Sequence, residues 1–367
     1  MKKIGMLTSG GDCQGLNTAM RGVAKALYEA VPNLEIIGFL DGYKGLIEDN
    51  FRKMKPANFS GILTLGGTIL ATSRQPHRSM KLPLEEDGPT RLELMIKTVK
   101  RHELDCVVIL GGNGTHKTAN LLSENGVPVV TLPKTIDNDL WGTDVTFGFH
   151  SAVDVATNVV DSIHSTATSH GRVFIIELMG NSAGWLTLYA GVAGGADIIL
   201  IPEIPYDLNS ITEALRRRAQ QNKRFSIITI AEGAVSKENA DLSKKERLRL
   251  REKSKYPSLA YDLAAQLSSA TGQEIRVTIP GHFQRGGHPS AYDRVLATRF
   301  GTAAAKLVYE EKYGFMVGMH GYDIVPVPLA EVAGKLKLVP SDSAIVASAR
   351  AIGTSFGDVP PKPLKSR

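Results

Sequence analysis

The sequence predicts an α/β protein built from two doubly wound, Rossmann-like domains, with the active site in the cleft between them. Short apolar runs alternate with helical patterns along most of the chain, which is typical of parallel sheets covered by helices. The length of 367 residues favours more than one domain. Several predicted strands end in loops rich in glycine or charged residues, and open parallel sheets bind ligands at that edge.

The composition is that of a globular protein acting on small molecules. The chain is 43% hydrophobic and 22% charged, and no apolar run reaches the roughly 20 residues that span a bilayer. Two cysteines do not make a disulfide framework and the N-terminus lacks a signal-peptide pattern, so we expect a cytoplasmic protein. The net charge of +6 suits anionic small substrates, and without a concentrated basic face we expect neither nucleic acid nor a membrane as a partner.

The first domain is expected to take residues 1–148 and 283–330, and the second 149–282 and 331–358. Strands of the first are predicted at 3–9, 34–40, 105–110 and 127–132, with helices at 16–27, 116–125 and 292–313 and a turn at 41–45. Strands of the second are predicted at 172–178, 197–201, 225–231 and 274–279, with helices at 147–168, 185–192 and 259–267. We interpret the polar segment 237–255 as a solvated insertion and 359–367 as a disordered tail.

Two glycine-rich loops follow predicted strands and lead into helices. Ser9-Gly-Gly-Asp-Cys-Gln-Gly-Leu-Asn17 comes after the first strand, and Gly111-Gly-Asn-Gly-Thr115 comes after the strand at 105–110. Glycines at the start of a helix let backbone N–H groups approach a phosphate, although tight turns also use glycine for steric reasons alone. Arg74 follows another glycine loop, and its guanidinium could bind a phosphate or simply face solvent. The spacing matches neither a P-loop nor a dinucleotide fingerprint.

The run Thr131-Leu-Pro-Lys-Thr-Ile-Asp-Asn-Asp-Leu140 gathers a cation, a hydroxyl and two carboxylates just beyond a predicted strand. Asp137 can act as a general base, Lys134 can bind negative charge, and Thr135 can position a substrate by hydrogen bonding. The alternative interpretation is an Asx-rich turn that caps the next element. Because this run and the two glycine loops follow strands of one parallel sheet, we expect them at the same edge, which favours a functional site.

Five motifs in this order resemble the phosphofructokinase family over nearly the whole chain. They are Leu7-Thr-Ser-Gly-Gly-Asp12 with Gly15 and Asn17, Gly111-Gly-Asn-Gly-Thr115, Pro133-Lys-Thr-Ile-Asp-Asn-Asp139, Met179-Gly180, and Gly281-His-Phe-Gln-Arg-Gly-Gly287. The resemblance implies phosphoryl transfer to the 1-hydroxyl of fructose 6-phosphate in glycolysis, with Mg²⁺ as cofactor and ATP or pyrophosphate as donor. Such a transfer needs mainly positioning and positive charge around an anionic transition state.

The resemblance also implies roles for individual residues. Asp137 would take the hydroxyl proton, with Lys134 and Thr135 beside it. The donor phosphates would lie against Gly11, Arg74, Gln75, Gly112, Asn113, Gly114 and Thr115. The sugar phosphate would lie against Met179, Gly180, Asn181, Glu232, His282, Phe283, Gln284 and Arg285, in addition to Thr135 and Asp137. Arg172 and Arg276 match arginines that a neighbouring subunit supplies, so the resemblance implies a homodimer or homotetramer with shared active sites.

The chain departs from the family pattern at residues that affect the metal and the donor. Asn113 stands where the family usually has the Asp of its magnesium site, and an amide oxygen is a poorer ligand for a hard cation. Gly114 resembles ATP-using members because it leaves room for the α-phosphate of a nucleotide, whereas Lys134 resembles the pyrophosphate users. ATP is the favoured donor, since excluding a nucleotide needs bulk that Gly114 lacks. His164 replaces an effector-binding arginine of regulated bacterial members, so simple ADP activation is not expected.

Other interpretations stay open. A pyrophosphate-dependent fructose 6-phosphate 1-phosphotransferase would use the same residues. An NAD or lipid kinase shares a GGDGT-like loop, but the sugar-phosphate motif at 281–287 and Met179-Gly180 argue against it. A regulatory subunit that binds sugar phosphate without turnover would account for Asn113, but the presence of Asp137 and Lys134 favours an enzyme.

Overall fold

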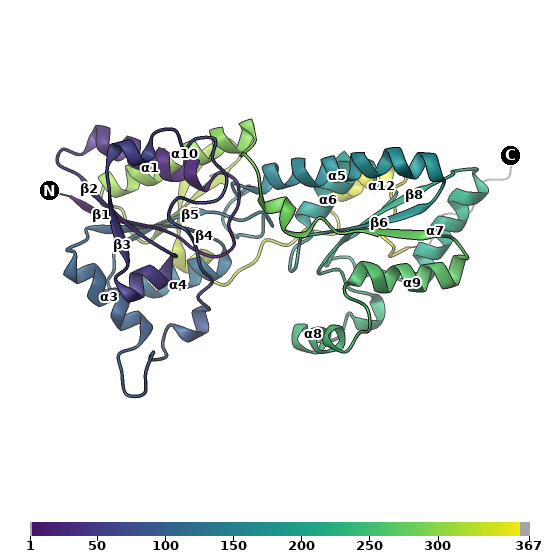
Figure 1. Ribbon diagram of the computed structural model, residues 1–367, viewed down its shortest axis with the longest axis horizontal. Helices are drawn as coiled ribbons and strands as arrows, with labels where there is room; N and C mark the ends of the chain where they lie inside the picture. The colour runs from purple at the N-terminus through teal and green to yellow at the C-terminus, as the bar shows by residue number, and fades with distance from the viewer. Residues whose placement is uncertain (1, 360–367) are drawn as a thin grey trace. The chain divides into compact units, whose positions relative to one another are not determined.

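The computed structural model describes residues 2–359, which form two compact units (Figure 1). The first unit runs to Ala152 and resumes over Arg285–Lys337, and the second takes Val153–Gln284 and resumes at Leu338. The chain therefore passes between the units after residues 152, 284 and 337, where the expected domains changed after 148, 282 and 330. The tail predicted at 359–367 lies outside the described residues apart from its first residue.

The first unit contains a seven-stranded sheet in the order β11-β10-β5-β4-β1-β2-β3. Its strands are β1 (Lys3–Thr8), β2 (Glu35–Phe39), β3 (Phe51–Met54), β4 (Cys106–Gly111), β5 (Val129–Pro133), β10 (Phe315–His320) and β11 (Asp323–Pro328). The central strands pair in parallel, while β3 and β11 pair antiparallel at the two edges. The strand order reverses beside β1, so the loops after β1 and β4 flank the switch point at which such sheets bind ligands.

Helices cover both faces of this sheet. They are α1 (Leu16–Ala30), α2 (Tyr43–Glu48), α3 (Arg91–Arg101), α4 (Asn113–Glu124), α10 (Ala291–Tyr309) and α11 (Leu329–Val332), with short 3₁₀ turns at Pro56–Phe59 and His77–Ser79. Figure 1 shows α1 and α10 on one face and α3 and α4 on the other. Apolar residues of α1 recur with the helical period and are buried, which holds the helix on the sheet. On the opposite face, Met95 of α3 and Leu122 of α4 pack with strand residues such as Ile109 in one core.

The second unit contains a parallel four-stranded sheet in the order β7-β8-β6-β9. Its strands are β6 (Val173–Leu178), β7 (Ile198–Leu200), β8 (Ser226–Ala231) and β9 (Ile275–Thr278). Its helices are α5 (Phe149–His170), α6 (Trp185–Ala193), α7 (Leu208–Gln220), α8 (Lys244–Glu252), α9 (Leu259–Thr271) and α12 (Ala344–Ala351), with 3₁₀ turns at Lys237–Asn239 and Gly281–Arg285. The first turn of α5, up to Ala152, and Arg285 belong to the first unit. Every residue of β6 and β8 is buried, as expected of strands covered on both faces.

The doubly wound α/β class is confirmed, but several predicted boundaries were wrong. α2 begins at Tyr43, inside the predicted turn, because the side chain of Tyr43 is buried in the core and holds the segment against the sheet. α10 ends at Tyr309 rather than at residue 313, and Glu311 just beyond it has a left-handed φ of 57°. α4 begins at Asn113 rather than at 116, so its first turn lies within the glycine loop. None of the described helices is long and apolar enough to cross a membrane.

Candidate active site

Three loops of the first unit meet at the carboxyl edge of its sheet, as the sequence predicted. The backbone N–H of Ser9 donates to the carbonyl of Leu110 over 2.9 Å, and that of Lys134 donates to the carbonyl of Gly111 over 3.0 Å. The hydroxyl of Thr115, which is 5% exposed, donates to the carbonyl of Ser9 over 3.4 Å. Each loop is thus tied to its neighbour where its strand ends, and the two glycine loops and the run after β5 form one surface.

Lys134 connects the loop after β5 to the first glycine loop. Its ammonium donates to the carbonyl of Gly11, and the residue is 3% exposed. Burial lowers the pKa of this ammonium below its ordinary value; Cys13 opposes that change and Arg285 adds to it. A buried cation beside two glycine loops is poorly solvated by water, which makes an anionic ligand a favourable partner for it.

A second cation, Arg285, contacts the first glycine loop although it lies far from that loop in the sequence. Nη1 of Arg285 donates to the carbonyl of Asp12 over 3.0 Å. A Cβ atom added to Gly11 would lie 2.9 Å from the same nitrogen, which shows how closely the guanidinium approaches the loop. Arg285 was predicted to bind the sugar phosphate, and the structure places it in the first unit against the donor-side loop.

The second glycine loop leads directly into α4. Gly112 is the N-cap residue of this helix, whose first backbone N–H groups and dipole favour an anion at that end. A Cβ atom on Gly111 would lie 2.3 Å from the Cβ of Thr115, so only glycine fits between strand and helix there. A Cβ atom on Gly114 would have no neighbour within 4 Å, whereas the side-chain amide of Asn113 donates to the carbonyl of Lys335 over 2.6 Å.

The segment carrying Arg74 and Gln75 lies against the first glycine loop. The backbone N–H of Gly10 donates to the carbonyl of Ser73 over 3.1 Å, and the hydroxyl of Thr72 donates to the carbonyl of Gly10 over 2.7 Å. Arg74 itself is exposed and Gln75 is half-buried. The backbone contacts therefore bring the two predicted donor-binding side chains to the edge of the same surface.

The run after β5 contains two carboxylates, and both of their residues form hydrogen bonds with Thr135. The backbone N–H of Asp137 donates to the hydroxyl oxygen of Thr135 over 3.1 Å, and the Thr135 side chain also hydrogen-bonds Asp139. Burial raises the pKa of Asp139, although hydrogen bonds and the cations Lys337 and Lys134 counteract that rise. Asp137 is half-buried. Asp139 is half-buried as well, so exposure does not distinguish the two carboxylates, and the choice of Asp137 as the base rests on the family resemblance.

In the second unit, predicted sugar-binding residues gather at the carboxyl edge of the sheet. The backbone N–H of Met179 donates to Oε1 of Gln284 over 3.2 Å, and Gln284 is fully buried. Gly180 has a φ of 133°, which favours glycine, and its carbonyl accepts the N–H of Gly233, the residue after Glu232, over 3.1 Å. The loops after β6, β8 and β9 are thereby joined.

Two residues of the motif at 281–287 present their side chains to solvent. His282 is exposed, and Phe283 is 71% exposed. Both belong to the short 3₁₀ turn Gly281–Arg285, in which Gln284 alone is buried. Single exposed apolar side chains are common on protein surfaces, so the exposure of Phe283 does not by itself indicate a ligand.

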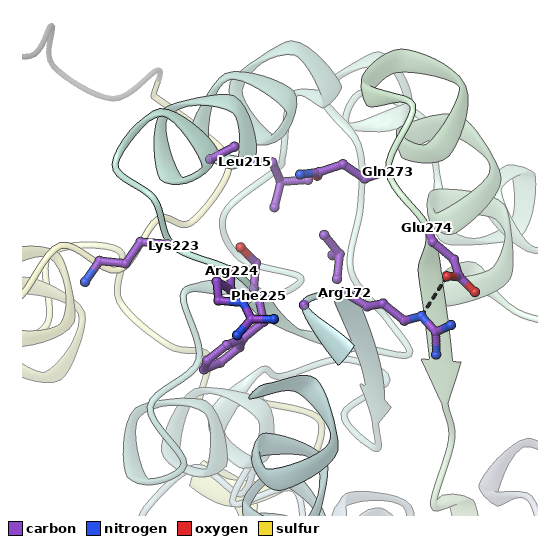
Figure 2. Close-up of a pocket in the computed structure, with 11 residues that line it drawn as sticks. Arg172, Leu215, Lys223, Arg224, Phe225, Gln273 and Glu274 are labelled. Atoms are coloured by element: carbon purple, nitrogen blue, oxygen red, sulfur yellow. Dashed lines mark hydrogen bonds and ion pairs between the residues drawn. The ribbon is translucent and has the colours of Figure 1, made fainter. Parts of the chain in front are cut away.

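Arg172 and Arg276 do not lie with those residues. Arg172 precedes β6 and Arg276 pairs in register with Phe174 near the start of that strand, whereas Met179 follows its end. At about 3.3 Å per residue, the two edges are roughly 20 Å apart. Both arginines form ion pairs with Glu274, the contact of Arg172 measuring 2.6 Å. Figure 2 shows Arg172 turned toward Glu274 at a pocket of about 140 Å³.

Comparison with known proteins identifies this combination of loops. A sequence model of the family described as "Phosphofructokinase" matches residues 3–308, a stretch that contains the loops of both units. The chain belongs to the phosphofructokinase family. The family resemblance of the five motifs is thus confirmed over most of the chain.

Individual phosphofructokinases match nearly the whole chain. The ATP-dependent 6-phosphofructokinase of Spirochaeta thermophila is 56% identical over 97% of this chain and 98% of its own length. The ATP-dependent 6-phosphofructokinase of Propionibacterium freudenreichii subsp. shermanii is 46% identical over 97% of this chain and 99% of its own. The crystal structure of a pyrophosphate-dependent phosphofructokinase from Nitrosospira multiformis superposes with a TM-score of 0.80, covering 100% of this chain and 95% of that one, at 19% identity. The last comparison shows a shared fold.

The sequence did not reveal several residues that hold the candidate site in place through long-range hydrogen bonds. The hydroxyl of Tyr43 donates to the carbonyl of Thr115 over 2.8 Å beneath the second glycine loop. Lys337 donates to the loop after β5, and Lys244 donates to Asn181 in the second unit. Each contact joins residues far apart in the chain, so no local pattern could have revealed it.

Few protein ligands are available for the metal that is expected at Asn113. Within residues 2–359, no three His, Cys, Asp or Glu side chains gather in a group that could hold a metal ion. Asn113 directs its amide nitrogen to Lys335, which leaves its amide oxygen as the possible ligand atom. Mg²⁺ usually keeps several waters and binds through one or two protein oxygens together with substrate phosphates. The residues present therefore fit a metal that is carried mainly by a phosphorylated donor.

Proposed function

We propose that this protein is an ATP-dependent 6-phosphofructokinase, which transfers the γ-phosphoryl group of ATP to O1 of fructose 6-phosphate. The observation that carries the proposal is the meeting of Lys134 and Asp137 with two glycine loops at the switch point of the first sheet. The relatives named ATP-dependent 6-phosphofructokinase, 56% and 46% identical to this chain, support it. Glycolysis in the cytoplasm is the corresponding biological setting.

The donor side is assigned to the first unit. Backbone N–H groups of Gly11 and of Gly112–Thr115 would hold the donor phosphates, with Arg74 and Gln75 at the edge. Lys134 would add a fixed positive charge where the transferred phosphoryl group becomes most negative. Mg²⁺ would enter with ATP and neutralise phosphate charge, with the amide oxygen of Asn113 as a contact.

The acceptor chemistry depends on Asp137. Its carboxylate would take the proton from the 1-hydroxyl as that oxygen bonds to phosphorus, and the bond between the γ-phosphorus and ADP would break. Thr135 accepts the backbone N–H of Asp137 over 3.1 Å, so its hydroxyl would help to hold the residue that carries the carboxylate and would also lie beside the phosphoryl group. Asp139, held by Thr135, is assigned no proton transfer.

The sugar phosphate is assigned to residues that mostly belong to the second unit. Met179, Gly180, Asn181 and Glu232 would bind the sugar hydroxyls at the carboxyl ends of β6 and β8. The ring of Phe283 and the buried amide of Gln284 would line the same surface, and His282 and Arg285 would hold the 6-phosphate.

Arg172 and Arg276 lead to a proposal about assembly. They lie roughly 20 Å from the sugar-binding loops of their own sheet, so they cannot reach a sugar bound there. Each subunit would instead place these arginines in the active site of its neighbour. The protein would then be a homodimer or homotetramer with shared active sites. Glu274, which pairs with both, would hold the guanidinium groups in position.

A pyrophosphate-dependent enzyme is the second candidate, and Lys134 is the observation that favours it. Gly114 argues against this candidate. A Cβ atom added there would have no neighbour within 4 Å, so no atom at this position excludes a nucleotide. A regulatory subunit without turnover is disfavoured because Asp137 and Lys134 are both retained at one surface.

A coupled assay distinguishes these functions. Purified protein is supplied with fructose 6-phosphate and Mg²⁺ and with either ATP or pyrophosphate, and formation of fructose 1,6-bisphosphate is followed. We expect rapid turnover with ATP. Turnover with pyrophosphate alone would establish the second candidate, and binding of fructose 6-phosphate without product from either donor would establish a regulatory subunit.

A further inference from the structure

The polar segment 237–255 does more than face solvent. Residues 244–255 include seven Lys or Arg and two Glu, and no residue of α8 is buried. Figure 1 shows α8 standing outside the layers of the second unit, on the same side as α9. Because the helix has no apolar face in a core, its position depends on a few polar contacts.

Those contacts reach the candidate sugar-binding loops. Nζ of Lys244 donates to Oδ1 of Asn181 over 2.8 Å and to the hydroxyl of Ser182 over 2.9 Å, just beyond β6. Nη2 of Arg251 lies 3.5 Å from the carbonyl of Ala234, just beyond β8. Both ends of the helix are thus attached to loops at the carboxyl edge of the sheet.

The ammonium of Lys244 has one N–H donor left for a ligand beside Asn181 and Ser182. It has three N–H donors, of which two serve the neutral side chains of Asn181 and Ser182. Among residues 2–359, no carboxylate forms an ion pair with it. This cation therefore contacts a loop that is expected to bind a phosphorylated sugar, which a purely solvated insertion does not explain.

We propose that Lys244 is a further substrate-binding residue, whose ammonium donates to an oxygen of the sugar phosphate bound beside Asn181. The inference rests on the proposed function, since it takes Asn181 as part of the sugar-phosphate surface. Asn181 and Ser182 hold the lysine in place so that little side-chain freedom is lost when the anion arrives. The capping box between Ser243 and Glu246 fixes the helix end that carries Lys244.

The neighbouring lysine provides a matched control. Lys245 is exposed on the same helix turn, and its side chain forms no hydrogen bond or ion pair within residues 2–359. Lys245→Met therefore removes the same charge from the same region. Lys244→Met should raise the KM for fructose 6-phosphate about tenfold, as expected for one charge-assisted hydrogen bond, with kcat changed less than twofold. Lys245→Met should change both less than twofold, and Lys244→Arg should recover most of the affinity.

Calorimetric titration with fructose 6-phosphate, without a donor, separates this inference from the proposed function. Weaker binding by Lys244→Met than by wild type or Lys245→Met supports it. Equal binding by all three proteins overturns it, as does an equal loss in the two variants, which would reflect only the summed charge of α8. Faster proteolysis of α8 in Lys244→Met with unchanged sugar binding would assign Lys244 a purely structural role. Wild-type protein that binds fructose 6-phosphate but makes no product would instead overturn the proposed function.

Discussion

Nζ of Lys337 donates to Oδ1 of Asn138 over 3.1 Å, although the two residues are 199 positions apart. The same ammonium donates to the carbonyls of Thr143 and Asp144 over 2.9 and 2.7 Å, and the backbone N–H of Lys337 donates to the carbonyl of Asp139 over 2.9 Å. One lysine from the end of the first unit therefore holds the loop that carries the candidate base. Burial lowers the pKa of Lys337 to about 8, against the opposing effect of Asp144 and Asp139.

Replacing Lys337 with Met should loosen this loop. The change removes three hydrogen bonds that the ammonium donates, and a loss of about 2 kcal/mol of stability is expected. A fall of about tenfold in kcat should accompany it, since catalysis depends on the position of the loop. Urea denaturation and steady-state kinetics measure the two effects. Lys335→Met, which removes an exposed lysine two residues away, is the control, and equal losses in both variants would contradict a specific role for Lys337.

Asp137→Asn should abolish most turnover while leaving substrate binding nearly intact. The amide has almost the same shape as the carboxylate but cannot take a proton, and general bases typically contribute 10²–10⁴-fold to rate. We expect kcat to fall by about that factor, with the KM for fructose 6-phosphate within about threefold of wild type. Asp87→Asn, at an exposed loop position with a left-handed φ of 62° that Asn tolerates, should behave as wild type. Near-normal turnover in Asp137→Asn would assign the base elsewhere.

Gly114→Asp should separate nucleotide binding from folding. A Cβ atom at this position meets nothing within 4 Å, and the residue lies in the first turn of α4, so stability should change by less than about 0.5 kcal/mol. The new carboxylate would repel the nucleotide phosphates, and the KM for ATP should rise at least about tenfold with the KM for fructose 6-phosphate unchanged. Gly114→Asn, of similar size but uncharged, is the control. An equal effect of both substitutions would indicate a steric cause.

Acid should destabilise the support of the second glycine loop through His116. This fully buried residue donates through Nδ1 to the carbonyl of Gly112 over 2.8 Å, and burial lowers its pKa from 6.5 to about 4. Between these values the unfolded chain binds a proton that the folded protein does not, so stability falls as the pH falls from about 6.5 to about 4. At ~1.4 kcal/mol per pH unit, the loss from this group approaches about 3 kcal/mol.

Chemical denaturation across that pH range tests the assignment. His116→Gln keeps a hydrogen-bond donor but does not titrate, so its stability should depend less steeply on pH than that of wild type. His170→Gln removes an exposed histidine and should keep the wild-type slope. Parallel slopes for all three proteins would show that other groups cause the acid sensitivity.

Elements with strong local periodicity were predicted well because their signal is contained in neighbouring residues. The apolar residues of α1 and the buried runs of β4 and β5 identify those elements without any knowledge of their partners. The missed strand β11 contains Pro326 and Pro328, which weaken a strand pattern, and it exists because it pairs with β10 at the edge of the sheet. Its formation depends on a partner and not on its own sequence.

The α/β class, the glycine loops, and the cluster of Lys134, Thr135 and Asp137 beyond a buried strand could all be predicted from the sequence alone. These features follow from patterns and residue types within short segments. The long-range contacts of these loops are visible only in the folded protein: Lys134 with Gly11, Lys337 with Asn138, and Lys244 with Asn181. Hydrogen bonds and desolvation depend on which residues are neighbours in space. Residues that are far apart in the chain share no local sequence pattern from which their contact could be predicted.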